Sequence, residues 1–271
     1  MSGKIRLLKD DSGFTLVELM VVILLTAIAV ISIYRGYTAF SQAADAQQQI
    51  MEMQQNLRIG MSRLVADLRR AGINEEDGDV AGFVVGNTIS VEFSMDLGSE
   101  NGPTVFGTDG LDNDDDGEID EDDESMIGDG DITDNGEQIK YFLTPSTLDN
   151  TTNDLIRSVW AGGSTAAFVS QTLITNVEAL NFVYWDAGTV GPPAVDPDTL
   201  DAPLSESDLK VVDRVDVTLV VRTSNEDYRY INTETYRNLE NEEVWPAPNP
   251  HPNDNFRRRA FSMKVQIRNN I

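Results

Sequence analysis

The sequence predicts an α+β protein in which one long N-terminal helix packs on a mostly antiparallel β-sheet. Two observations predict this class. No proline occurs before Pro103, and the first seventy residues combine an apolar run with an amphipathic helical stripe. Beyond residue 72 the apolar residues alternate with period two, and no helix-length pattern separates the strand candidates.

The first element is an apolar run over residues 14–34, which contains one charged residue, Glu18. As a helix these residues extend roughly 31 Å, about the thickness of the hydrocarbon core of a bilayer. Lys4, Arg6 and Lys9 precede the run, so the positive-inside rule places the N-terminus in the cytoplasm. The sequence therefore predicts a single membrane span.

The second element continues the same helix. Its apolar residues recur every three or four positions, which predicts one buried stripe made of Ile50, Met53, Leu57, Met61, Leu64 and Leu68. Arg69 and Arg70 suit the negative end of the helix dipole, and Gly72 is a plausible C-terminal cap. We expect one helix over residues 14–71, roughly 87 Å long.

The strands follow. Alternating apolar faces predict strands over 89–95, 215–221 and 261–267, and residues 83–85 before Gly86 and Asn87 indicate the first arm of a hairpin. Weaker strand candidates are 139–143, 155–160 and 180–185. Two acidic, proline-rich segments, 187–207 and 238–255, are expected to be loops, with His251 exposed in the second.

The composition excludes several classes of function. The formal net charge of −26 disfavours nucleic acid or an anionic lipid surface as a main partner. The absence of cysteine excludes disulfides, thiolate metal sites and a cysteine nucleophile, and a single histidine excludes multi-histidine metal sites. No phosphate-binding loop, nucleophile elbow or dinucleotide fingerprint occurs. We therefore expect a protein that is not an enzyme.

The charge is concentrated in one region. Residues 74–137 contain 22 acidic residues and no Lys or Arg. Within this region, residues 112–123 fit the pattern D-x-D-x-D-G-x-I-x-x-x-D, close to the spacing of an EF-hand loop. Gly117 would allow the sharp bend, and hard oxygen ligands favour Ca²⁺. The predicted ligands are Asp112, Asp114, Asp116, Glu118 (through its carbonyl), Asp120 and Asp123.

Two features keep the calcium prediction open. Asp123 stands where the usual loop has a bidentate Glu, and no amphipathic helix flanks the loop. The alternative is a flexible acidic loop in which the match arises because every second residue is acidic. A bound calcium ion would have a structural role, folding a segment that otherwise repels itself.

The start of the apolar run carries a specific motif. The string S-G-F-T-L-V-E over residues 12–18 resembles the leader of type IV prepilins, the class III leader. The resemblance implies that a prepilin peptidase cuts after Gly13 and that the new first residue, Phe14, is N-methylated. It also implies that Glu18 pairs with the N-terminal amine of a neighbouring pilin subunit during fibre assembly.

Two other interpretations of the apolar run remain. It could be an uncleaved single-pass anchor, or a signal peptide cleaved after the A-I-A string at residues 27–29. Glu18 argues against both, because a carboxylate within an apolar span is costly unless it has a partner.

The end of the helix and the end of the chain suggest a subgroup. Residues 68–73, L-R-R-A-G-I, and residues 257–269 resemble PilW-type minor pilins. The J-type minor pseudopilins of type II secretion share the plan of a long helix and a β-rich head, and they remain an alternative. A membrane-anchored calcium-binding module that never polymerises and a secreted enzyme behind a signal peptide are the rival classes.

The resemblance implies a pilin-like organisation. Residues 1–13 form a cytoplasmic leader, residues 14–72 the long helix, and residues 73–271 a β-rich head with an acidic insertion at 107–137. The expected function is that of a minor pilin which primes or caps assembly of a fibre. Its expected partners are prepilin peptidase, other pilin or pseudopilin subunits and the inner membrane, with the head in the periplasm and later in the fibre.

Overall fold

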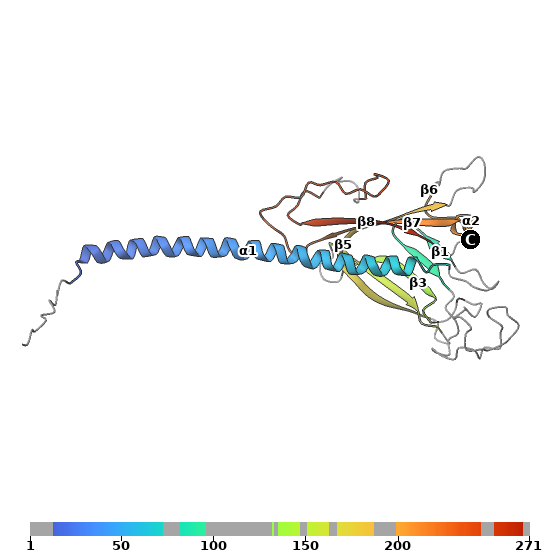
Figure 1. Cartoon of the computed structure of the whole chain (residues 1–271), viewed down its shortest axis with the longest axis horizontal. Helices are drawn as coiled ribbons and strands as arrows, with labels where there is room; N and C mark the ends of the chain where they lie inside the picture. The colour runs from blue at the N-terminus through green and yellow to red at the C-terminus, as the bar shows by residue number, and fades with distance from the viewer. Residues whose placement is uncertain are drawn as a thin grey trace, which may run out of the picture. The chain divides into compact units, whose positions relative to one another are not determined.

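The structure is a computed structural model that describes residues 13–72, 82–95, 132, 135–146, 151–162, 167–186, 199–244 and 252–267. The chain divides into two compact units, Met1–Gln48 and Gln49–Ile271. We call the second the head unit. Helix α1 (Leu16–Leu68) contributes to both units (Figure 1).

Helix α1 is continuous over 53 residues, which confirms the prediction of a single long helix. It begins two residues later than expected because Thr15 caps it. It ends at Leu68, and tighter bonds follow, from the Arg70 amide to the Asp67 carbonyl and from the Ala71 amide to the Leu68 carbonyl. Gly72 then adopts a left-handed φ of 76° and donates to the Ser94 carbonyl, so the chain turns away at this glycine.

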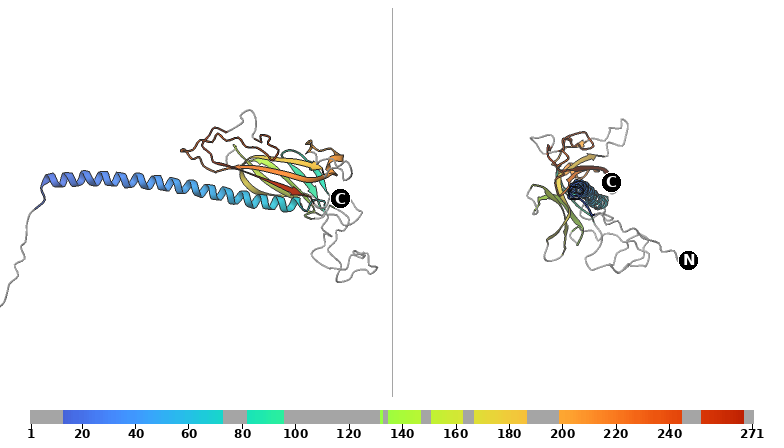
Figure 2. Two further views of the ribbon diagram at one scale, coloured as in Figure 1. Left: turned by 45° about the horizontal axis from the view of Figure 1, so that its top comes forward. Right: turned by 90° about the vertical axis from the view of Figure 1, so that its left-hand side faces the viewer.

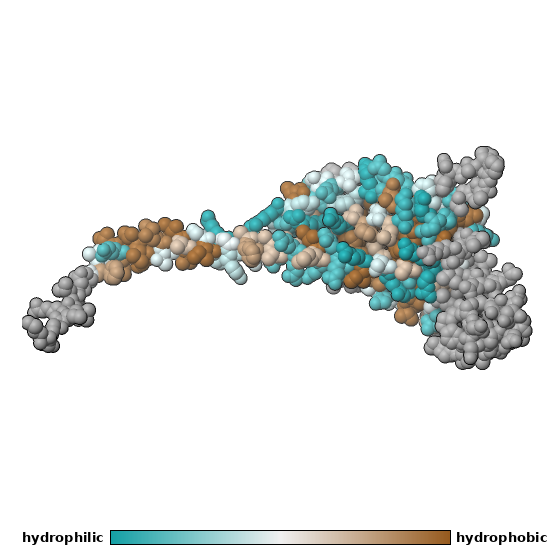
Figure 3. Space-filling model, viewed as in Figure 1, coloured by the Kyte–Doolittle hydropathy of each residue, from teal (hydrophilic) through white to brown (hydrophobic). Residues whose placement is uncertain are grey.

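In the first unit the large apolar side chains of α1 are all exposed. An 18-residue window of this helix has a mean hydropathy of 2.8, and none of it is buried. Figure 3 shows these residues as a brown surface along the helix. The helix is long and apolar enough to cross a bilayer.

The head unit contains one antiparallel sheet in the order β1-β2-β3-β4-β5-β7-β8, with the short β6 paired to β5. All strand pairs are antiparallel, which confirms the predicted sheet type. The strands are β1 (Phe83–Gly86), β2 (Val91–Ser94), β3 (Gln138–Pro145), β4 (Asn153–Trp160), β5 (Phe168–Asp186), β6 (Thr199–Leu200), β7 (Val212–Arg222) and β8 (Arg258–Gln266).

The weaker strand candidates are all present, as parts of β3, β4 and β5. Strand β5 is far longer than expected, at 19 residues: its first half pairs with β4 and its second half with β7. A bulge with Asn176 at a φ of 58° separates the two halves. The expectation of a plain loop over 187–207 is wrong, because β6 lies within it and a one-turn helix, α2 (Glu206–Leu209), begins before its end.

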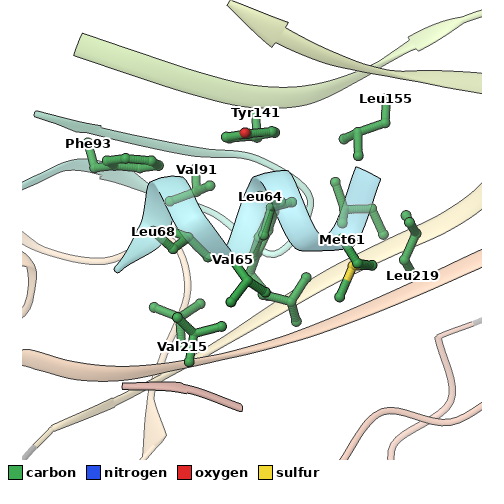
Figure 4. Packing of buried hydrophobic residues seen from close by; sticks show 14 of the residues in the cluster. Met61, Leu64, Val65, Leu68, Val91, Phe93, Tyr141, Leu155, Val215 and Leu219 are labelled. Carbon is green, nitrogen blue, oxygen red and sulfur yellow. The ribbon is translucent and has the colours of Figure 1, made fainter. Parts of the chain in front are cut away.

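The core of the head unit forms where the last turns of α1 pack on one face of the sheet (Figures 2 and 4). The predicted stripe is confirmed: Ile50 is partly buried and the other five members are buried. Gly60 lies where the helix approaches β5, since a Cβ there would come within 2.2 Å of Ile174 Cδ1. This glycine lets the backbone of α1 approach the sheet closely.

A buried carboxylate also joins α1 to the sheet. Asp67 is 1% exposed and accepts hydrogen bonds of 2.6 Å from both the Tyr141 hydroxyl and Arg157 Nε. Arg63 Nε lies 3.3 Å from the same oxygen. Burial raises the pKa of Tyr141, and the Asp67 carboxylate raises it further. The carboxylate therefore has strong donors in a place where it could not remain unpaired.

Part of the opposite face of the sheet, over β5, β7 and β8, is covered by the strap, which we define as the described residues 223–244 and 252–257. Tyr236 of the strap packs with Ala179 and Val220 in a small second cluster. Arg258 binds both Glu178 and Asp254 and ties the end of the strap to β5. Because the strap covers β7, residues on both faces of its second half are buried, whereas the pattern predicted one buried face.

Candidate functional site: the start of the long helix

Helix α1 starts with a capping box made by Thr15 and Glu18. Glu18 Oε2 accepts hydrogen bonds of 2.9 Å from the Thr15 backbone N–H and from the Thr15 hydroxyl. The Glu18 N–H donates to Thr15 Oγ1 at 3.3 Å, and the Leu19 N–H makes the first helical bond to the Thr15 carbonyl. The two side chains thus satisfy backbone donors that the first turn leaves open.

The predicted processing junction lies just before this cap. Gly13 and Phe14 have no helical or strand conformation. The position of a Cβ on Gly13 has nothing within 4 Å, and Phe14 is 87% exposed. A peptide bond outside a helix has no intrahelical hydrogen bond to lose, so the bond between these two residues can enter an enzyme's cleft without unwinding α1.

The structure therefore brings the three predicted residues together at one helix end: Gly13 and Phe14 before the cap, and Glu18 within it. Sequence reasoning missed Thr15. Its signal was present, since T-x-x-E before an apolar run is the pattern of a capping box. In the unprocessed chain Glu18 has a local partner, so the cap lowers the cost of carrying this carboxylate at the edge of an apolar span.

Further along the helix, two hydroxyl side chains bond back to the helix backbone. Ser32 Oγ donates to the Ile28 carbonyl at 2.8 Å, and Thr38 Oγ1 donates to the Arg35 carbonyl at 3.1 Å. Hydroxyls that bond back to their own helix need no water. The exposed surface of this half is thus suited to an apolar environment.

The predicted calcium ligands at residues 112–123 lie outside the described residues. His251 lies outside them too. Among the residues that the structure describes, no group of three or more His, Cys, Asp or Glu side chains could hold a metal ion. The calcium loop stays a prediction.

Comparison with known proteins gives two family matches. Residues 8–34 match the prokaryotic N-terminal methylation motif, and residues 139–269 match the family of type IV pilus-assembly protein W, PilW. A type IV-like pilin from Thermus thermophilus is similar in structure at 14% sequence identity, with a TM-score of 0.44 over 80% of this chain and 97% of that chain. No curated protein matches the sequence.

The two family matches include the leader motif at 12–18 and the resemblance at 257–269, whereas the resemblance at 68–73 lies outside both. The methylation motif includes Gly13, Phe14 and Glu18, and the PilW match extends over strands β3 to β8 and the basic run at 257–269. Over residues 8–34 and 139–269 the chain is therefore similar to type IV pilin-like proteins, and over the second region it is similar to the PilW family.

Proposed function

We propose that this protein is a minor pilin, a structural subunit that primes or caps assembly of a type IV pilus-like fibre after its leader is removed. The observation that carries the proposal is the first half of α1, which exposes every large apolar side chain and has one carboxylate, Glu18, at its start. Such a surface needs lipid before assembly and other apolar helices after it. Its role is assembly and not catalysis.

Cleavage after Gly13 would create a positively charged amine on Phe14, one helical turn before Glu18. In the unprocessed chain the Glu18 carboxylate accepts hydrogen bonds from Thr15. In a fibre the amine of a neighbouring subunit would join or replace these donors, because an ammonium and a carboxylate neutralise each other where water is excluded. Glu18 would thereby set the axial position of one helix against the next.

The same proposal fixes the topology. Lys4, Arg6 and Lys9 would hold the leader in the cytoplasm, and residues 14–34 would span the inner membrane. The head would then lie in the periplasm until the subunit enters a fibre. The PilW match over 139–269 favours a pilus over the secretion pseudopilus of the J-type alternative.

Processing is tested by the intact mass of the full-length protein, extracted from membranes with and without a co-expressed prepilin peptidase. We expect a peptidase-dependent product that begins at N-methylated Phe14. A chain that stays whole in both cases, or one that begins at Val30, would contradict the proposal and restore the anchor or the signal peptide.

Assembly is tested separately with Glu18→Ala and the matched variant Thr15→Ala. Both remove the capping box, but only the first removes the carboxylate. We expect both proteins to be processed, and only Thr15→Ala to enter sheared fibres. Normal assembly of Glu18→Ala would show that the carboxylate has no role beyond the cap and would favour a simple anchor.

We also propose that residues 112–123 bind one structural Ca²⁺. The support is the ligand spacing of the sequence and the need to neutralise a region with 22 acidic residues. Calorimetric titration of the full-length protein in detergent with Ca²⁺ tests it, with Asp114→Ala/Asp116→Ala as the control. We expect saturable binding that the double variant loses, and equal heats from both proteins would contradict the site.

A further inference from the structure

The two ends of the sheet differ. At one end β1 has four residues, and the Gly86 carbonyl accepts a hydrogen bond of 2.9 Å from the Leu204 N–H, with the Leu204 side chain packed over Gly86. At the other end β8 has nine residues and pairs with β7 along its whole length. Within the described residues no strand pairs with the outer side of β8.

The hydrogen bonds at both ends of β8 show which backbone groups face outward. The Thr223 N–H donates to the Arg257 carbonyl at 2.8 Å, and the Ile267 N–H donates to the Asp213 carbonyl at 2.7 Å. Both bonds join odd-numbered residues of this segment to the β7 side. Because bonding direction alternates along an antiparallel strand, the N–H and C=O groups of the even-numbered residues point to the open edge. These include Ala260, Ser262, Lys264 and Gln266.

This edge is basic, although the protein is strongly acidic. The described residues 255–267 contain four basic residues and no acidic one, in a chain with a net charge of −26. Ion pairs with the strap and β5 hold Arg257 and Arg258. Arg259 is exposed, and Phe261 is 39% exposed. The Lys264 side chain is 56% exposed, with its Nζ 3.9 Å from Asp216 Oδ2. The open side of β8 thus combines positive charge with an accessible aromatic ring.

We propose that β8 is a docking edge that receives an extended, acidic segment of another protein chain as an additional strand. Backbone hydrogen bonds to the even-numbered residues would supply the affinity. The side chains of Arg259 and Lys264 lie on opposite faces of the sheet, so acidic side chains on either face of the added strand would have a basic neighbour that supplies the selectivity. Basic residues on an edge also deter pairing with a like-charged edge, which disfavours the β8 of a second copy. The inference does not depend on Glu18 or on leader cleavage.

The test uses the full-length protein in detergent and a nine-residue capped peptide that alternates Glu and Val and carries fluorescein. A peptide that alternates Lys and Val is the control. Fluorescence anisotropy should show saturable binding of the Glu/Val peptide that weakens as salt is added, and at least tenfold weaker binding of the Lys/Val peptide. Equal binding of the two peptides, or no binding of the Glu/Val peptide, would overturn the proposal.

A pair of variants separates strand addition from charge attraction. Lys264→Pro and Lys264→Thr both remove the charge, but only proline removes the outward N–H, and proline is tolerated where that N–H faces solvent. We expect Lys264→Thr to weaken binding about threefold and Lys264→Pro at least tenfold. Equal losses in both variants would contradict strand addition.

Amide hydrogen exchange in the wild-type protein gives a readout that does not depend on whether the proline variant folds. Addition of the Glu/Val peptide should slow exchange at Ala260, Ser262, Lys264 and Gln266, while the odd-numbered amides, which already bond to β7, keep their rates. Unchanged exchange at these four amides would overturn the proposal.

Discussion

Residues 16–48 and residues 49–68 of α1 share one backbone conformation and have opposite surroundings. In the first segment every large apolar side chain is exposed, whereas in the second Met53, Leu57, Met61 and Leu64 are buried against the sheet. The carboxylates differ in the same way: Glu18 bonds only to its own helix turn, and Asp67 bonds to Tyr141 and to Arg157.

The comparison shows that the helical conformation of a segment does not determine which surroundings its side chains need. Hydrogen bonds within α1 satisfy the backbone of both segments, so secondary structure alone does not distinguish them. The head unit supplies its own apolar contacts to the second segment. For the first segment those contacts would come from lipid or from other helices, as the proposed assembly role would require.

Among substitutions that compare the two segments, we expect the largest difference in stability from removing their carboxylates. Asp67→Ala should lower the free energy of unfolding of the head by about 3–5 kcal/mol, because it leaves Arg157 and the Tyr141 hydroxyl without their acceptor in a buried place. Glu18→Ala should leave the head unchanged. Urea unfolding followed by tryptophan fluorescence reports on the head alone, since Trp160, Trp185 and Trp245 all belong to it. Equal midpoints for the two variants would refute the comparison.

A second pair of substitutions compares a leucine of each segment. Leu64 is 0% exposed and Leu24 is 61% exposed. Leu64→Ala should destabilise the head by about 2–5 kcal/mol through lost contacts and a cavity, and Leu24→Ala should change it by less than about 0.5 kcal/mol. The same fluorescence titration checks both, and a loss on Leu24→Ala comparable to that on Leu64→Ala would mean that the first segment also stabilises the head.

A carboxyl of the strap is expected to make the stability of the head unit depend on pH. Burial, together with the neighbouring Asp216 carboxylate, which favours the protonated form, raises the pKa of Glu240 to about 7, and one oxygen of each carboxyl is buried. Arg214 and Lys264 are the cations near Asp216. The folded head thus binds a proton that the unfolded chain releases near pH 4.5. The stability that this one proton contributes is fully present below that pH and is lost as the pH rises to about 7.

After allowance for solvent screening, we expect this loss to be about 1–2 kcal/mol. Glu240→Gln should remove most of the slope between pH 4.5 and pH 7, while the full-length wild type keeps it. Urea titrations at several pH values within this window measure both, and parallel pH profiles for the two proteins would show that Glu240 does not carry the proton.

The smallest effect is expected from two glycines of α1. Gly60→Ala places a methyl group 2.2 Å from Ile174 Cδ1, whereas the position of a Cβ on Gly36 has nothing within 4 Å. Overpacking costs more than the helix propensity that alanine gains, so Gly60→Ala should destabilise the head by about 1 kcal/mol. Gly36→Ala should not. A more stable Gly60→Ala protein would show that Ile174 moves aside at little cost.

Much of the fold follows from periodicity, and the exceptions have physical causes. Stripes with a spacing of three or four predicted the buried face of α1, and alternation predicted β2 and β7. The first half of β5 went unrecognised because Ser170, Gln171 and Thr172 leave it with no apolar face. Phe261 was expected to be buried with Val265 but is 39% exposed, because β8 is an edge strand that the core covers only toward its end.

The candidate site was more predictable than the sheet because it depends on neighbouring residues. Gly13, Phe14 and Glu18 were identified from one short motif, and Thr15 could have been identified from the same residues. Contacts such as that between Asp67 and Arg157 join residues 90 positions apart, and no local pattern indicates them. The strap on the outer face of β7 could not be predicted from periodicity either. The alternation in β7 indicates one apolar face, but the strap covers the other face, so both faces are buried.

One feature of the sheet bears on how such proteins can diverge. Strands β2 and β3 pair in register from Val91 with Tyr141 to Ser94 with Gln138, although more than forty residues join them. The entropy of closing a connection grows only with the logarithm of its length, by about 0.6 kcal/mol for each doubling. This junction can therefore gain, lose or exchange whole segments over evolutionary time while the pairing around it stays the same. It is a position where related subunits can acquire new surface properties without redesigning their fold.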